Sequence, residues 1–338
     1  MPTMLDYQTH ERPIEADEAV SRRPILVTGI PRSATSWVGK MLDASGEVVY
    51  INEPLNVCHP PGQSPGVLRA PVDFRFQYIS EANEHIYLEP FRETLRFQYH
   101  FRDELRRNRS VPDLLRMVQH SSSFMRGRVR GRRPLLDDPF AVFSAEWFAR
   151  RLSCQVVVVV RHPAAIISSR KRLGWRADFD SLLRQPAMLA DWLEPFRDEM
   201  EALRRTDDEV AEGALLWRMV YSVVAEQKQR HPELHVVRHE DLSLDPVGGF
   251  AGLFAAFGLP FSGKTIRLIE RATSGRDRER RVAWSLSRSG PARTAFRRLD
   301  SRVNASRWKS SLSPAEISRI RSLTSDVASL YYADDEWE

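Results

Sequence analysis

Short apolar runs alternate along the chain with longer segments of helical periodicity. Residues 156–160 are five consecutive valines, a pattern typical of a strand that is covered on both faces of a parallel sheet. Residues 25–29, 48–51, 135–136 and 234–238 predict further strands. Because strands and helices alternate, we expect an α/β fold with a central, mainly parallel sheet flanked by helices.

The segments between these strands predict the helices. Residues 35–44 directly follow the first strand and place their apolar side chains on one side of a helix. A last helix is predicted at 313–329, with Ser313 as N-cap and Pro314 at the first helical position. The other expected helices are 87–125, 141–152, one that begins near 163, 188–204, 212–231 and 247–257.

The pattern also divides the chain into regions. Residues 1–23 are polar and acidic and predict a flexible N-terminal tail. Residues 24–338 are expected to form a single domain, with a helical cap insertion at about 56–133. Residues 274–306 are rich in arginine and serine without an apolar period, which predicts a stretch that is mobile or ordered by a ligand.

Composition narrows the class of protein. Hydrophobic residues make up 42% and charged residues 28% of the chain, as in a globular protein that dissolves in water. No apolar run reaches the roughly 18 residues that span a bilayer, and no secretory pattern opens the chain. Cys58 and Cys154, the only cysteines, support neither a disulfide framework nor a zinc cluster. We therefore expect a cytoplasmic protein.

The charge is modest but unevenly distributed. Fifty basic and 45 acidic residues give a net charge of +5, and arginines gather at 126–133 and 276–298. Such clusters suit phosphate or other anionic ligands, although a solvated surface explains them equally well. Since no zinc-finger, helix-turn-helix or RNA-recognition pattern accompanies them, nucleic acid is not an expected partner.

The segment after the first strand predicts a phosphate site. Residues 29–37 read GIPRSATSW and connect the strand to a helix N-terminus, where backbone N–H groups and the helix dipole favour an anion. Ser33, Thr35 and Ser36 add hydroxyl donors, and Arg32 adds a fixed positive charge. The Gly-Lys-Ser/Thr ending of nucleoside triphosphatases is missing. The sequence therefore favours a phosphate site without a built-in position for a metal.

A second pair of anion-binding side chains follows the valine run. Arg161 stands at the end of that strand, and Ser169 comes eight residues later, about two turns into the next helix. From these positions both side chains can reach one phosphate. The alternative is a surface ion pair for Arg161 and a serine that faces solvent.

The first loop resembles the 5′-phosphosulfate loop of the sulfotransferases that use 3′-phosphoadenosine 5′-phosphosulfate (PAPS), especially the bacterial and carbohydrate types. The resemblance implies a P-loop-like sulfotransferase fold with a helical insertion. It places Arg32 where members carry Lys or Arg, and Trp37 where an aromatic ring stacks on adenine, whereas Ala34 replaces the usual Gly. The implied cofactor loop comprises Pro31, Arg32, Ser33, Ala34, Thr35, Ser36 and Trp37.

Two other segments extend the resemblance. Arg161 and Ser169 are similar to the pair that holds the 3′-phosphate in the family. Residues 308–313 read WKSSLS and resemble the element that follows the family's C-terminal phosphate loop, which implies nucleotide contacts for Lys309 and Arg302. The Arg-Lys-Gly sequence of that loop is missing here.

At one position the charge of the side chain differs from the charge that relatives often carry. Residues 137–139 read DDP where relatives often show Lys-Asp-Pro, so Asp137 occupies the lysine position. If that lysine contacts the sulfuryl oxygens in relatives, this chain must supply the charge elsewhere. Arg133 or an arginine of the cap is the expected substitute.

Transfer to a hydroxyl also requires a base that accepts its proton. Glu53 is the first choice, because it follows the second strand in a segment that resembles the Glu-Pro element of carbohydrate sulfotransferases. A right-handed strand–helix–strand unit would place that strand beside the phosphate loop. His59 is the next candidate and His162 the third, and Glu53 could instead pair with a cap arginine. Arg32 is expected to stabilise charge on the leaving phosphate.

These inferences predict an enzyme. We expect in-line transfer of a sulfuryl group from PAPS to a hydroxyl of a glycan, glycolipid or small metabolite, with a carboxylate or His as base and without a metal. A P-loop-type kinase and a non-enzymatic nucleotide- or polyanion-binding protein are the alternatives. The acceptor and the oligomeric state are not determined by the sequence.

Overall fold

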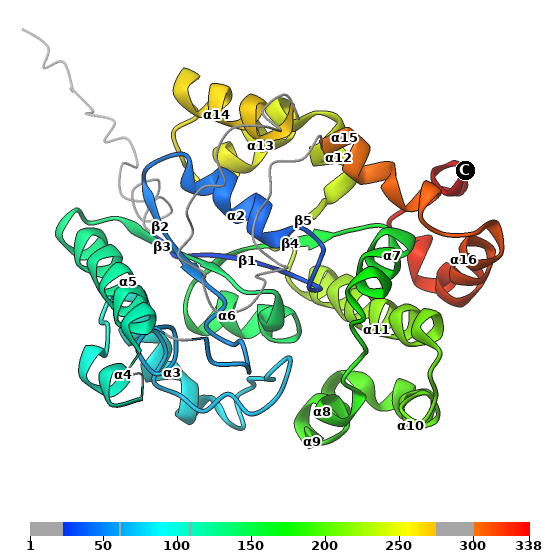
Figure 1. Cartoon of the computed structure of the whole chain (residues 1–338), viewed down its shortest axis with the longest axis horizontal. Helices are drawn as coiled ribbons and strands as arrows, with labels where there is room; N and C mark the ends of the chain where they lie inside the picture. Colours follow the sequence, from blue (N-terminus) through cyan, green and yellow to red (C-terminus); the bar gives the residue numbers. More distant parts are fainter. Residues whose placement is uncertain (1–22, 61, 108–109, 275–300) are drawn as a thin grey trace, which may run out of the picture.

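The computed structural model describes residues 23–60, 62–107, 110–274 and 301–338. The predicted tail, apart from Arg23, and the arginine cluster at 276–298 lie outside these residues. The described chain forms a five-stranded parallel sheet in the order β2-β3-β1-β4-β5 (Figure 1). The strands are β1 (Ile25–Gly29), β2 (Val48–Asn52), β3 (Arg133–Asp137), β4 (Gln155–Val160) and β5 (His235–Arg238). The predicted α/β architecture is confirmed.

The central strand is β1. Ile25 lies opposite Leu135 of β3 on one side and Gln155 of β4 on the other. β2 pairs with β3 and not with β1, because β3 lies between them. Every residue of β3 is buried, whereas β2 is half-buried, so the two strands take an inner and an edge position respectively.

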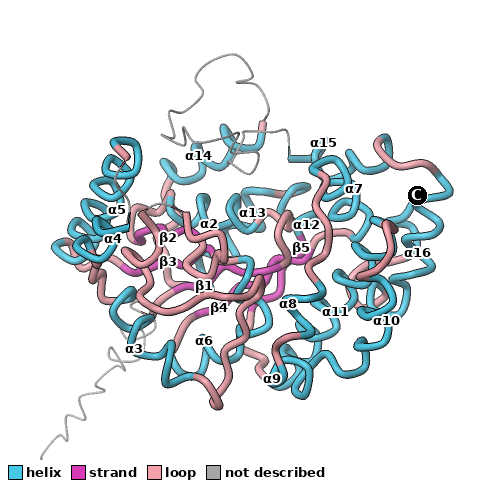
Figure 2. The backbone as a smooth tube through the Cα atoms, turned by 60° about the horizontal axis from the view of Figure 1, so that its bottom comes forward, coloured by secondary structure: helices cyan, strands magenta, loops and turns pink. Residues whose placement is uncertain are grey.

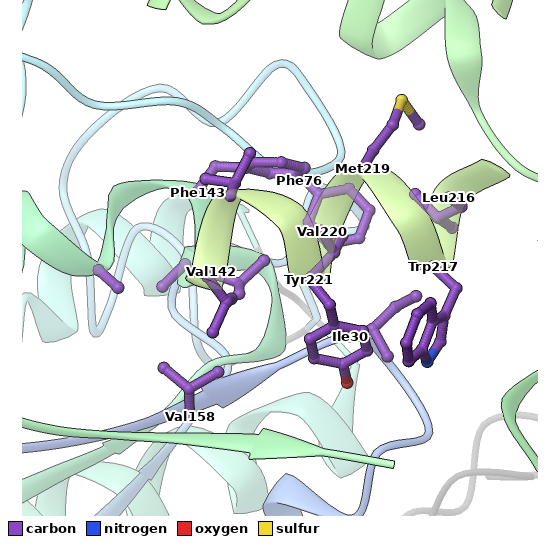
Figure 3. Packing of buried hydrophobic residues seen from close by; sticks show 14 of the residues in the cluster. Ile30, Phe76, Val142, Phe143, Val158, Leu216, Trp217, Met219, Val220 and Tyr221 are labelled. Atoms are coloured by element: carbon purple, nitrogen blue, oxygen red, sulfur yellow. The ribbon is translucent and has the colours of Figure 1, made fainter. Parts of the chain in front are cut away.

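Helices cover both faces of the sheet (Figure 2). Alternate residues of β1 and β4 point to opposite faces, so Val27 and Val159 join one core cluster, and Leu26 and Val158 join the other. Figure 3 shows Val220 and Tyr221 in the second cluster, close to Val158. The first face is covered by α2 (Thr35–Asp43), α12 (His239–Leu244), α13 (Pro246–Ala256) and α14 (Gly263–Thr273), and the second by α6 (Ala145–Arg151), α7 (Pro163–Leu173), α11 (Glu209–Arg230) and α16 (Pro314–Ala328).

The predicted helical stretch 87–125 consists of three helices, α3 (Glu84–Leu95), α4 (Phe101–Arg107) and α5 (Val111–Val129). A left-handed residue, Phe97 (φ 57°), follows the first helix, and Ser110 caps the third through the N–H of Asp113. Since α5 continues to Val129, the arginine-rich loop expected at 126–133 was wrong for its first half.

Two other predicted helices are interrupted. The stretch 141–152 begins as the 3₁₀ helix η1 (Pro139–Ser144) before α6. The stretch 188–204 contains a π turn at η2 (Leu189–Leu193) and a 3₁₀ turn at η3 (Glu194–Phe196), which begins beside Pro195, before α10 (Arg197–Leu203). Short elements complete the description: α8 (Phe179–Leu183), α9 (Pro186–Met188), α15 (Ser301–Ser306), η4 (Arg307–Ser310) and η5 (Asp334–Trp337).

The C-terminal helix confirms its predicted start. Ser313 accepts the N–H of Glu316, and the Glu316 carboxylate accepts the N–H of Ser313, which together form a capping box. Pro314 opens the helix as expected. None of the helices in the described ranges is long and apolar enough to cross a membrane.

Candidate active site

A cavity of about 1210 Å³ lies at the carboxyl edge of the sheet. Segments that follow β1, β2, β3 and β4 line it, together with the C-terminal segment around α15 and η4. This edge, beside the central strand, is where open parallel sheets bind ligands. The predicted site residues that line the cavity are Pro31, Arg32, Ala34, Thr35, Ser36, Trp37, Glu53, Arg161 and Ser169.

The loop after β1 has the geometry of an anion-binding turn. Arg32 and Ala34 adopt left-handed conformations (φ 86° and 82°), and the N–H of Ser33 donates to the carbonyl of Ile30 at 2.9 Å. Left-handed residues alternating with others bring successive N–H groups to one side, and α2 adds its positive end. The Ser33 side chain is buried behind the loop and does not line the cavity, whereas Thr35 and Ser36 do.

Hydrogen bonds join this loop to the second predicted anion site. Arg32 Nε donates to Ser169 Oγ at 3.0 Å, and Arg161 Nη1 donates to the carbonyl of Arg32 at 3.0 Å. Arg161 Nη2 donates to the carbonyl of Asn304 at 3.1 Å, which ties the C-terminal segment to the same point. The structure therefore brings together residues that the sequence separates by up to 272 positions, from Arg32 to Asn304.

Arg161 is held as a buried cation. Its Nε has no hydrogen-bond partner among the described residues, and burial lowers the pKa of its guanidinium. The nearby Glu240 accepts the N–H of His162 and the hydroxyl of Tyr332. Burial opposes the ionised form of Glu240, but His239, Arg161 and the His162 N–H outweigh it and lower the pKa of Glu240 to about 2. An ionised Glu240 thus partly offsets the charge of Arg161.

Arg172 and Arg307 also line this end of the cavity, and the sequence did not predict them. Burial first, and then Arg161 and Arg172, lower the pKa of Arg32. Burial and Arg307 likewise lower the pKa of Arg172. Within the described ranges, none of these four arginines has a carboxylate oxygen within 4.0 Å. Grouped guanidinium ions without counter-charges are suited to an anionic ligand.

Neither Arg302 nor Lys309 reaches the cavity. Arg302 Nη2 donates to the carbonyl of Leu244 at 3.0 Å, and Lys309 Nζ lies 5.5 Å from the ring centre of Trp308. From the same segment, Asn304 and Arg307 line the cavity instead.

Trp37 lies at the edge of the nucleotide-sized space. Its ring is 9% exposed and meets His239 and Phe250 edge-on, with centroid distances of 5.6 and 5.3 Å. Both Trp37 and His239 line the cavity. The predicted contact of Trp37 with adenine stays a prediction.

Glu53 lies at another part of the cavity wall. It has a left-handed conformation (φ 44°), and its N–H donates to the carbonyl of Asp137 at 2.7 Å. The side chain of Asn56 donates to Glu53 Oε2 at 2.6 Å. Burial, and then the charge of Asp137, raise the pKa of Glu53 to about 7. A carboxyl group that titrates near neutrality suits proton transfer.

Asp138 fixes the segment that carries Glu53. Its Oδ2 accepts the N–H of Leu55 at 2.6 Å, and its Oδ1 accepts the N–H of Phe140 at 3.0 Å. The Asp138 N–H donates in turn to the carbonyl of Val27 in β1. Asp138 therefore connects the end of β1, through its backbone N–H, to the Glu53 segment, through its buried carboxylate.

Asp137 lies behind the phosphate loop and is fully buried. It accepts a hydrogen bond from the hydroxyl of Tyr50, and the nearby side chains of Ser36 and Thr35 favour its ionised form. Burial raises the pKa of Asp137 despite these donors. The residue at the family's lysine position is thus a buried carboxyl group that hydrogen-bonds to Tyr50 and lies near the hydroxyls of the loop.

The prediction that Arg133 replaces that lysine was wrong. Arg133 begins β3, at the opposite edge of the sheet from the cavity. Its guanidinium donates to the carbonyls of Arg23 and Phe257 and to the side chain of Gln155, at 2.8, 2.6 and 2.5 Å. Among arginines of the segment between β2 and β3, Arg75 lines the cavity.

The two candidate histidines point elsewhere. His59 Nδ1 lies 3.1 Å from Ser64 Oγ, and His59 is not part of the cavity wall. His162 is buried and stacks on Trp308 with a centroid distance of 4.5 Å, and burial lowers its pKa to about 4. Of the candidate bases, the structure brings Glu53 to the cavity.

Comparison with known families agrees with this geometry. The family model described as "Sulfotransferase family" matches residues 24–263, which is more than half of the chain. The chain belongs to the sulfotransferase family. The match ends before Arg307, so that part of the cavity wall rests on the structure of this sulfotransferase alone.

Solved structures show distant similarity. The sulfotransferase domain from the curacin biosynthetic pathway is 14% identical with a TM-score of 0.45, covering 90% of this chain and 98% of that chain. The sulfotransferase domain of a Synechococcus olefin synthase is 16% identical with a TM-score of 0.45, covering 93% and 96%. A Mycobacterium avium sulfotransferase is 12% identical with a TM-score of 0.43, covering 93% and 78%. No curated protein matches this sulfotransferase.

The backbone of the phosphate loop provides a stability test. Ala34 holds a left-handed conformation that glycine adopts without a steric penalty. We expect Ala34→Gly to raise the free energy of unfolding by up to about 1 kcal/mol, measured by urea denaturation. The matched control is Ala44→Gly, because Ala44 has a right-handed conformation (φ −64°) and should lose stability. Destabilisation by Ala34→Gly would contradict the strained turn.

Proposed function

We propose that this sulfotransferase transfers the sulfuryl group of PAPS to a hydroxyl of a small metabolite, glycan or glycolipid. The observation that carries the proposal is the Arg32–Ser169 hydrogen bond, which joins two anion sites at one end of a single cavity. Two phosphate-binding sites next to each other suit a nucleotide that bears phosphate at both its 5′ and 3′ positions.

The residues present fit such a donor. The unpartnered Nε of Arg161 and the uncompensated Arg172 and Arg307 are suited to a dianionic 3′-phosphate. The loop N–H groups, with Thr35 and Ser36, would hold the 5′-phosphosulfate, and Trp37 would border adenine. When bound, PAPS supplies a sulfuryl group attached to a good leaving phosphate.

Arg32 and the loop would stabilise charge on the leaving side. Ser169 occupies the Nε of Arg32, which leaves its two terminal nitrogens as donors for anion oxygens. Donors that are already fixed in place need little rearrangement as charge develops.

Glu53 would accept the proton of the acceptor hydroxyl. It lines the cavity, and its segment is fixed to β1 through Asp138. Its pKa of about 7 gives a substantial basic fraction at neutral pH together with useful proton affinity.

Ligand-dependent stability separates the proposal from its alternatives. We expect adenosine 3′,5′-bisphosphate at 100 times its dissociation constant to stabilise the fold by about 2.7 kcal/mol, measured by thermal shift. ATP with Mg²⁺ should stabilise it much less. Stabilisation by ATP with Mg²⁺ alone would favour a kinase. Bisphosphate binding without release of product from PAPS in the presence of any acceptor would favour a binding protein.

The arginines at the nucleotide end provide a second test. Arg172→Gln and Arg307→Gln should each weaken bisphosphate binding roughly 10-fold or more, because each removes a charge-assisted hydrogen bond. Adenosine 5′-monophosphate, which lacks the 3′-phosphate, should be affected far less, and titration calorimetry measures both ligands. Arg302→Gln and Lys309→Gln are the comparison variants. If Arg302→Gln and Lys309→Gln weaken bisphosphate binding instead, the family resemblance locates the 3′-phosphate site correctly and the assignment from the cavity wall is wrong.

The base assignment gives a third test. Glu53→Gln should lower kcat by about 10²–10⁴-fold and leave bisphosphate affinity within about two-fold. Because Glu53 acts as the carboxylate, kcat/KM should fall as pH drops through about 7. Asn56 stabilises that carboxylate by donating to it, so Asn56→Ala should move the acidic limb to higher pH. Normal turnover by Glu53→Gln would make His59 the next candidate.

A further inference from the structure

Arg75 projects from a rigidly held segment into the cavity wall. Its backbone N–H donates to Ser181 Oγ at 3.3 Å. The next residue, Phe76, is buried and meets the rings of Phe140 and Phe143 at centroid distances of 5.7 and 5.6 Å (Figure 3). The backbone that carries Arg75 is thus held in place by a hydrogen bond and by the packing of the next residue.

The charge of Arg75 is not compensated within the described chain. Its Nε is buried without a hydrogen-bond partner, and so is Nη2 of its neighbour Arg170. Neither arginine has a carboxylate oxygen within 4.0 Å in the described ranges. Burial first, and then the charge of Arg75, lower the pKa of Arg170 to about 10, as two adjacent like charges require.

The nearest carboxylate that acts on Arg170 is already occupied. Glu212 Oε2 accepts from Arg176 Nε at 2.8 Å, and Glu212 Oε1 accepts from Arg176 Nη2. Arg176 also pairs with Asp207 at 3.1 Å. Arg176 is therefore neutralised, whereas Arg75 at the cavity wall and the buried Arg170 beside it form no ion pair within the described ranges.

A count of charges indicates which kind of ligand would neutralise Arg75 and Arg170. A donor with a 3′-phosphate and a 5′-phosphosulfate carries about four negative charges. Four arginines, at positions 32, 161, 172 and 307, line the end of the cavity suited to it. Asp178, which lines the wall near Arg75, caps Ser181 at 3.1 Å and forms no ion pair within the described ranges. When Asp178 is counted against Arg75 and Arg170, one positive charge remains that neither the donor nor a protein carboxylate at this wall would neutralise.

We propose that the acceptor carries an anionic group, such as a carboxylate, sulfate or phosphate, which Arg75 binds with Arg170 behind it. The inference rests on the proposed function and specifies its acceptor. Val57, Phe140 and Trp175 line the same cavity, so the acceptor would be a hydroxyl compound with an apolar body and an acidic group. Arg75 is a binding residue here, separate from the base.

A matched pair of acceptor probes tests the proposal. 3-(4-Hydroxyphenyl)propionate and 4-propylphenol share a ring and hydroxyl and differ in the carboxylate. We expect the bisphosphate-saturated protein to bind the acid at least 10-fold more tightly by titration calorimetry. The ratio of kcat/KM between the two should follow. Arg75→Gln should reduce this preference at least 10-fold, and Arg75→Lys should restore part of it.

Arg184→Gln is the control variant. Arg184 stacks on Phe74, next to Arg75 in the chain, but does not line the cavity. The Arg184→Gln variant removes one positive charge close to Arg75 in the chain and should leave the preference for the acid unchanged. Arg75→Gln should fold normally, because it removes a repulsion at Arg170 without breaking an ion pair within the described residues.

Three results would overturn the proposal. Equal binding of the two probes, or binding of neither, removes the anion site. A preference that survives Arg75→Gln assigns it to other residues. If Arg75→Gln lowers kcat equally for both probes and leaves their ratio of kcat/KM unchanged, Arg75 acts on the sulfuryl group and not on the acceptor. Bisphosphate affinity is measured in the same samples. A protein that does not bind the bisphosphate would contradict the proposed function, and that outcome is thereby distinguished from failure of the acceptor proposal.

Discussion

The site depends on a close backbone contact at Gly29, where β1 ends. A Cβ there would lie 2.6 Å from the carbonyl oxygen of Val159 and from Ser33 Oγ. Only glycine therefore lets the chain leave β1 so close to β4 and turn toward α2. Because β1 is the central strand, its turn receives the ends of both neighbours. β3 delivers Asp137 and Asp138 to one side of the turn, and β4 delivers Arg161 to the other.

This convergence makes the loop electrostatically strained without a ligand. Arg161 donates to the carbonyl of Arg32 on one side of the loop, and the buried Asp137 lies near Thr35 and Ser36 on the other. Burying like charges has a free-energy cost that the fold as a whole must offset. A bound dianion reduces that cost, so ligand binding and stability should be strongly linked at this end of the cavity.

Local signals made part of this site predictable from sequence. The strand at 25–29, the turn after it and the pair Arg161–Ser169 are each read from neighbouring residues, and the structure brings the turn and this pair to one cavity. Sheet order and the cavity wall depend on contacts between distant segments. Arg75 and Arg307 reach the wall because of how the chain between β2 and β3 and the segment after α15 pack, and no periodicity in the sequence encodes that.

The aspartate at the family's lysine position links the two halves of the proposed mechanism. A lysine at 137 would place a positive charge near Glu53 and lower its pKa, whereas Asp137 raises it. The substitution thus strengthens Glu53 as a base while it removes a cation from the neighbourhood of the loop. The cations that remain are arginines on the cavity wall, and Arg75 is one that forms no ion pair within the described residues. In the proposed mechanism, residue 137 therefore bears on the strength of the base, and Arg75 bears separately on the charge of the acceptor.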